Sequence, residues 1–271
     1  MRVASLPAKE RRSSFSKLSN EQKASFIRVN LALQFIKRPN MTKEQREFVL
    51  DAISKVSADI YEKSDPEKVK RNEQSGLEMI NRAFGLFPSK EAGDFVEPLN
   101  TSKDEEVTLL QKYEDLLKNG MKARRKIVKE MFVNDRVNIW KTQLAYHLAT
   151  GKFAKFQNEF VLEMLTTLSP ETFTARLNLT KEEESKAEEL LLSSILNAFT
   201  KEEGFAVFMS LGIQKYVKDE PVTTENPRAG VCNCNFYCEG DPSCGAPNGC
   251  QSSPVGDCGP YGTTRCNYLC G

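Results

Sequence analysis

All eight cysteines of this chain lie in its last 40 residues, between Cys232 and Cys270. The residues before Cys232 contain none. This distribution divides the chain into two physically different parts. The long cysteine-free part, rich in Lys and Glu, can bury an ordinary apolar core. The short tail is poor in aliphatic residues and needs covalent or metal cross-links to hold a fold.

Disulfide bonds are the cross-links that the tail composition favours. One tail residue in five is Cys, above the level of about 8–10% that is typical of disulfide scaffolds. The count is even, no CxxC motif occurs, and the single histidine, His147, lies outside the tail. We therefore predict four disulfides and no cofactor or metal, with zinc and free thiols as the alternatives. The predicted half-cystines are Cys232, Cys234, Cys238, Cys244, Cys250, Cys258, Cys266 and Cys270.

Disulfides imply an oxidising compartment, yet the first residues, MRVASLPAKERRSSFSKL, lack the apolar core of a signal peptide. We expect a secreted or cell-surface protein in its mature form, with the signal peptide absent from this sequence. Leaderless export of a cytoplasmic protein is the alternative. No apolar run of about 18 residues occurs, so the sequence predicts no membrane span.

The charge balance argues against two classes of partner. The chain has 38 basic and 37 acidic side chains, without the strong basic bias of a nucleic-acid-binding protein. Residues 226–271 contain two arginines and three acidic residues, so the tail is not a cationic membrane-disrupting peptide.

The sequence before the tail predicts a mainly α fold, with an all-α body over residues 1–217. Capping boxes begin at Ser19 and Thr42, and Asp65 precedes a proline in the way of a helix N-cap. The first helix, which continues to about Arg38, is apolar on all sides and should be well buried. After the helix that begins at Thr42, further helices are predicted over 66–85, 89–97, 103–118, 121–131, 134–150, 153–168, 181–199 and 201–217. Residues 218–230 read as an exposed linker, and 231–271 as a small disulfide-rich tail domain.

The helical body contains a candidate internal duplication. The segments 42–54 and 153–165 are similar: FVLD beginning at Phe48 matches FVLE beginning at Phe160 at an offset of 112 positions. Shorter matches before and after follow in the same order. We predict two helical units, at about 12–100 and 125–217, with Phe48 and Val49 equivalent to Phe160 and Val161 in the core. Chance similarity between amphipathic helices is the alternative.

Catalytic constellations are hard to find. His147 shares a predicted helix with Trp140 and Leu144, which favours a structural position over a catalytic one. No P-loop, Rossmann, GxSxG, HExxH or EF-hand motif is present. The glutamates at 182–184 and 188–189 suit the start of a helix better than acid/base chemistry. The sequence therefore predicts a protein that is not an enzyme, with a hydrolase site in the body as a weaker alternative.

Aromatic side chains between the cysteines are the candidate recognition residues of the tail. They are Phe236, Tyr237, Tyr261 and Tyr268. In so small a domain they either form the core or a recognition face. A lanthionine peptide is a poorer interpretation, because five Ser and Thr residues cannot supply eight thioether partners.

The tail resembles the C-terminal segment of proteins related to the bacteriocin fulvocin C. The motifs that carry the resemblance are CNCNFYC, DCGPYGTTRC and CNYLC. The resemblance covers about 40 residues closely and implies the half-cystine role of all eight cysteines. The chain departs from the pattern at Tyr268 and Asp257, where glycine is usual or common.

The resemblance implies a secreted, bacteriocin-like protein whose tail recognises a cell-envelope target on bacteria. The alternative is a cell-surface or assembly module in which the helical body binds a protein partner. No nucleic-acid partner is expected in either case.

Overall fold

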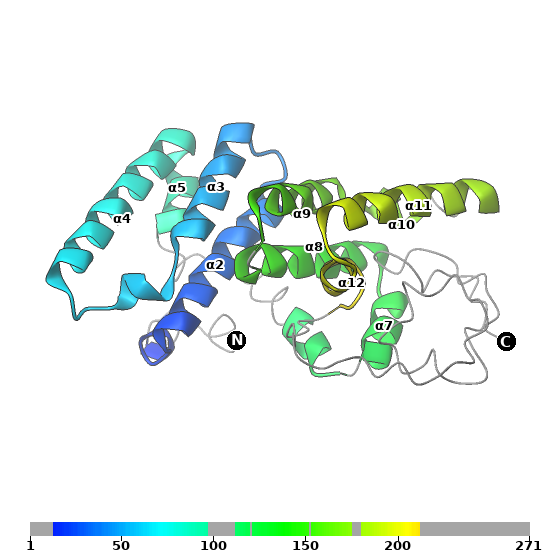
Figure 1. Ribbon diagram of the computed structural model, residues 1–271, viewed down its shortest axis with the longest axis horizontal. Helices are drawn as coiled ribbons and strands as arrows, with labels where there is room; N and C mark the ends of the chain where they lie inside the picture. The colour runs from blue at the N-terminus through cyan, green and yellow to red at the C-terminus, as the bar shows by residue number, and fades with distance from the viewer. Residues whose placement is uncertain (1–12, 97–111, 120, 152, 175–179, 212–271) are drawn as a thin grey trace. The chain divides into compact units, whose positions relative to one another are not determined.

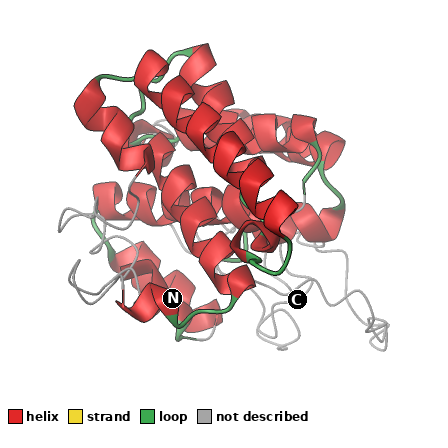
Figure 2. Cartoon of the chain, turned by 90° about the vertical axis from the view of Figure 1, so that its left-hand side faces the viewer, coloured by secondary structure: helices red, strands yellow, loops and turns green. Residues whose placement is uncertain are grey.

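The computed structural model describes residues 13–96, 112–119, 121–151, 153–174 and 180–211 of the chain (Figure 1). These residues form helices joined by loops, and no strand occurs among them (Figure 2). The predicted mainly α class is therefore confirmed for the described part of the body. The predicted linker and the disulfide-rich tail lie outside the described residues.

The labelled helices are α2 (Asn20–Lys37), α3 (Lys43–Lys55), the 3₁₀ helix η1 (Ala58–Tyr61), α4 (Pro66–Leu86), α5 (Ser89–Val96), α7 (Met121–Glu130), α8 (Val133–Thr150), α9 (Lys155–Thr167), α10 (Pro170–Thr174), α11 (Lys181–Ala198) and α12 (Lys201–Phe208). Residues 13–16 and 112–117 are helical as well. The sequence predicted most of these helices but neither η1 nor α10. Both are short, and a helix of one turn has too few residues to show a periodic apolar pattern.

The chain divides into two compact units, and the division falls within α8. Unit 1 comprises residues 1–115 and 144–167, and unit 2 comprises residues 116–143 and 168–271.

Side-chain caps fix where several helices begin. Ser19 and Thr42 form the predicted capping boxes with the glutamines three residues later, and the Asp65 carboxylate accepts two backbone N–H groups at the start of α4. Thr180 and Thr200 form two further capping boxes, which were not predicted from the sequence. Each cap satisfies backbone donors that the first helical turn leaves without a partner.

The core of unit 1 surrounds α2, which packs against α3, η1 and α9. Nine of its 18 residues are buried, as its apolar sequence predicts. A second apolar cluster joins α3 to the segment from α4 to α5. In that cluster the Phe48 ring lies 5.9 Å from Phe87 and 5.8 Å from Phe95, measured between ring centroids.

The core of unit 2 is built on Trp140 and Ile139 of α8 and on the C-terminal part of α12. The Gln143 amide donates to the Ala206 carbonyl at 3.1 Å, which joins α8 to α12. The predicted helix over 201–217 is too long, because α12 ends at Phe208. Leu211 then takes a positive φ of 36°, a conformation that does not continue a helix. Residues 212–217 are beyond the described part.

Helix lengths bear on the predicted duplication. α2 and α8 have 18 residues each, and α3 and α9 have 13 each. Phe48, Val49 and Val161 are buried, but Phe160 is only partly buried, so its predicted place in the core is wrong. Equal lengths do not distinguish a duplication from similar amphipathic helices, and the duplication remains a prediction.

Gly204 allows α12 to approach α11 closely, and we expect Gly204→Ala to destabilise the protein. A Cβ at this position would lie 2.7 Å from Cγ2 of the fully buried Ile195. Overpacking of this kind costs about 1–3 kcal/mol, which exceeds the gain in helix propensity. Urea unfolding measures the difference. The control is Gly76→Ala in α4, where nothing lies within 4 Å of the added methyl group and a gain of about 0.5–1 kcal/mol is expected. Stabilisation by both variants would contradict the close contact.

Candidate functional site: a groove between α3 and α4

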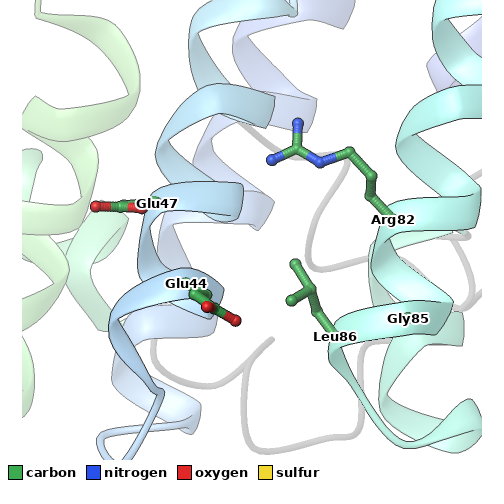
Figure 3. A pocket seen from close by; sticks show the side chains of 5 residues that line it. All are labelled: Glu44, Glu47, Arg82, Gly85 and Leu86. Atoms are coloured by element: carbon green, nitrogen blue, oxygen red, sulfur yellow. The ribbon is translucent and has the colours of Figure 1, made fainter.

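An open groove of about 420 Å³ lies between α3 and α4 of unit 1 (Figure 3). Its lining residues are Glu44 and Glu47 from α3 and Arg82, Gly85 and Leu86 from α4. The side chains of Arg82 and Leu86 reach from α4 toward α3. The groove therefore has an acidic side, a basic group and a small apolar surface.

The two helices that form the groove are joined at one end by Gln45. Its amide Nε2 donates to the Leu86 carbonyl at 2.7 Å, near the end of α4. Its Oε1 accepts the backbone N–H of Thr42 at 2.9 Å and so completes the capping box of α3. One side chain thus satisfies groups at the ends of two helices.

The groove arginine is held by its neighbours. Arg82 donates to the Asp51 carboxylate at 2.6 Å, and its guanidinium lies over the Phe48 ring at 5.4 Å. Lys55 also donates to Asp51, at 3.0 Å. Burial acts to raise the pKa of Asp51, but the hydrogen bonds and charges of Lys55 and Arg82 outweigh it, so that the pKa is lowered. Asp51 therefore stays ionised and fixes Arg82, which favours a structural role for this pair.

The carboxylates of the groove keep more freedom. Glu44 and Glu47 are in the first turns of α3, where the helix dipole favours negative charge. Glu44 is exposed, and Glu47 lies 3.9 Å from the ammonium group of Lys43, itself exposed. Solvated carboxylates that line a groove together with the Leu86 side chain suit the binding of a basic or amphipathic segment. The five lining residues include no hydroxyl, thiol or imidazole group for nucleophilic catalysis.

A second charged cluster joins α2 to α5. Arg38 donates to Glu91 at 2.9 Å and to Asp94 at 2.6 Å, and it also contacts the Gln34 side-chain oxygen. Its guanidinium lies over the Phe95 ring at 5.2 Å, and its side chain is only 14% exposed. Both carboxylates are turned toward one cation, so this cluster stabilises the packing of α5 and is not an acid/base pair.

His147 lies in the core, which agrees with the structural position that its helix neighbours favour. Its side chain is 3% exposed, and its ring stacks with Phe153 at 6.5 Å between centroids. Trp140 and Leu144, which the sequence placed on the same helix, are also buried. The imidazole is therefore part of the packed interior of the described residues.

The glutamates at 182–184 and 188–189 belong to α11, as predicted. Glu183 accepts hydrogen bonds from the backbone and hydroxyl of Thr180, which lower its pKa. This glutamate caps the helix. No group of three or more metal-binding side chains gathers anywhere in the described residues.

The cysteines and aromatic residues predicted as the site of the tail lie outside the described residues. Within the described residues, the structure adds the α3–α4 groove as a candidate site. This groove was not predicted from the sequence, because Arg82 and Asp51 are 31 positions apart and their pairing depends on helix packing.

Comparison of the chain with family models, with curated proteins and with solved structures gives no match. The resemblance of the tail to fulvocin C-related proteins therefore remains a prediction. Within the described helices we find none with the length and apolar character needed to cross a bilayer.

Proposed function

We propose that this chain is a secreted, non-catalytic protein that antagonises bacteria, and that its disulfide-linked tail recognises a target in the cell envelope. The observation that carries the proposal is the confinement of eight cysteines to the last 40 residues. Disulfides pre-organise a small domain and so lower the entropy cost of binding. The motifs of the tail and their resemblance to a bacteriocin-related family support an antagonistic role.

In this proposal the helical body serves as the scaffold that carries the tail. The histidine of the chain is buried in α8, and Asp51, Glu91 and Asp94 are committed to ion pairs. These positions give no support to the alternative of a hydrolase with its site in the body.

Recognition by the tail should depend on aromatic side chains more than on charge. The tail is slightly acidic, so lysis driven by its charge is not expected. We expect Tyr261→Ala and Tyr268→Ala to raise the inhibitory concentration of the full chain by at least about tenfold, since aromatic residues dominate binding energies at interfaces. The measurement is growth inhibition of related bacteria by each purified variant.

The matched control for these variants is Arg265→Ala, which changes a tail residue but removes charge instead of an aromatic ring. It should leave the inhibitory concentration nearly unchanged. Each variant must also show the mass of the fully oxidised chain, so that a lost disulfide is not mistaken for lost recognition. Full activity of both tyrosine variants would contradict recognition through these rings.

The second candidate is a surface or assembly module that binds a protein partner through the body. The groove between α3 and α4 favours it, because exposed carboxylates beside Leu86 suit a basic, amphipathic segment of another protein. Absence of growth inhibition by the full chain across a broad panel of bacteria would favour this candidate over the first.

A further inference from the structure

Two asparagines of the described residues lie outside helices, and both are exposed. They are Asn40, in the turn between α2 and α3, and Asn119, which follows the short helix over residues 112–117. The residue after Asn40 is Met41. The residue after Asn119 is Gly120, which has no side chain. The helical body thus contains one exposed asparagine before glycine and, for comparison, one before methionine.

An asparagine before glycine can lose its amide group without an enzyme. The backbone nitrogen of the next residue attacks Cγ of the asparagine, the bond from Cγ to the amide nitrogen breaks, and ammonia leaves with the proton of the attacking nitrogen. Water then opens the resulting five-membered imide at one of its two carbonyl groups, which gives aspartate or isoaspartate. Glycine favours the attack because no Cβ hinders its nitrogen and its backbone adopts more conformations.

The position of Asn119 suits this reaction. The N–H of Asn119 donates to the Leu116 carbonyl at 3.1 Å, three residues back, as in the tightened turn at the end of a helix. Its side-chain Nδ2 donates to the same carbonyl at 3.3 Å. This is a long hydrogen bond, and water competes for it because the residue is exposed. The side chain is therefore accessible to water at the end of a helix instead of within one.

Asn40 is exposed as well, but the nitrogen beside it is less able to attack. The N–H of Met41 donates to the Arg38 carbonyl at 3.3 Å. Met41 is only 5% exposed, so its side chain anchors that backbone in the core. The other asparagines of the described residues lie within helices, where the regular backbone keeps the next nitrogen in a fixed orientation.

We propose that Asn119 is a site of spontaneous modification, at which the chain slowly acquires aspartate or isoaspartate. The change weakens the end of the helix over 112–117. A carboxylate cannot donate, so the Leu116 carbonyl loses its hydrogen bond from Nδ2. The new negative charge also lies beside the carbonyl groups that end the helix, which repel it. Tyr113 and Leu116 of this helix are 1% and 3% exposed, so the modification destabilises a buried part of the body.

The test is incubation of the full chain in mildly alkaline buffer, with peptide mass spectrometry at intervals. We expect Asn119 to show the mass of the acid at least about tenfold sooner than Asn40, because only Asn119 precedes a residue without Cβ. The peptide map also distinguishes Asn119 from Asn248, which precedes Gly249 in the tail. Two product peptides of equal mass should separate by chromatography, since the imide opens on either side. Equal rates at Asn119 and Asn40, or a product with aspartate alone, would overturn the proposal.

Two kinds of variant separate the reaction from its consequence. Gly120→Ala adds a Cβ beside the attacking nitrogen and should slow the conversion about tenfold while the asparagine is retained. Asn119→Asp places the aspartate product in every molecule and should lower the melting temperature, and the uncharged control Asn119→Ser should lower it less. Unchanged conversion in Gly120→Ala would contradict the imide route. An unchanged melting temperature in Asn119→Asp would contradict the weakened helix end. None of these measurements depends on growth inhibition, so they stand or fail separately from the function of the tail.

Discussion

Reduction and alkylation of the eight cysteines should abolish growth inhibition by the full chain while the helical body stays folded. The described helices contain no cysteine, so reductant leaves their covalent structure untouched. The tail should lose about 2–4 kcal/mol of stability for each disulfide, more than so small an apolar core can replace. The measurements are the inhibitory concentration and the far-UV circular dichroism of the same sample.

Mass spectrometry provides the control for this result. The native chain should weigh about 8 Da less than the reduced chain, as four disulfides require. A chain that is alkylated without prior reduction should keep its mass and its activity. Equal activity of the native and the reduced, alkylated protein would contradict a mechanism that depends on the folded tail. Stoichiometric zinc or free thiols in the native protein would contradict the disulfides themselves.

Phe48→Ala should be the most destabilising single truncation in the packing between α3, α4 and α5. Its ring is 2% exposed and contacts Phe87, Phe95 and the Arg82 guanidinium. Truncation of a buried Phe costs about 3–5 kcal/mol, because the surrounding side chains only partly fill the cavity. For a protein of this size the melting temperature should fall by roughly 6–20 °C. Thermal unfolding followed by circular dichroism measures the shift.

The matched control is Phe156→Ala in α9, where the ring is 57% exposed. This truncation removes the same atoms from a solvated position, and the free energy of unfolding should change by no more than about 0.5 kcal/mol. Equal shifts in the two variants would show that the Phe48 cluster does not stabilise the unit.

Local features of this fold could be predicted from the sequence because their causes are local. A Ser or Thr followed three residues later by Gln specifies the starts of α2 and α3, whichever helices pack around them. The neighbours Trp140 and Leu144 on the same helix favoured a structural position for His147 without deciding between core and surface, and the structure places it in the core. The α12 helix was predicted too long, since a continuous apolar run does not show where the backbone turns.

Long-range features could not be predicted in the same way. Arg38 meets Glu91 and Asp94 across 53 and 56 positions. Exposed arginines and glutamates are common on helices, and no local pattern says which of them will meet. The groove beside Arg82 depends on such a meeting, since Arg82 and Asp51 are 31 positions apart.

The double use of Gln45 links the local stability of two helix ends. If the first turn of α3 opens, the Gln45 amide leaves the Leu86 carbonyl at the end of α4. Conversely, if α4 unwinds from its C-terminus, the side chain that closes the capping box loses one of its two anchors. The two ends should therefore open together as one cooperative unit, and amide protons at both ends should exchange with solvent at coupled rates. Gln45 therefore ties the stability of the groove to both of the helix ends that it joins.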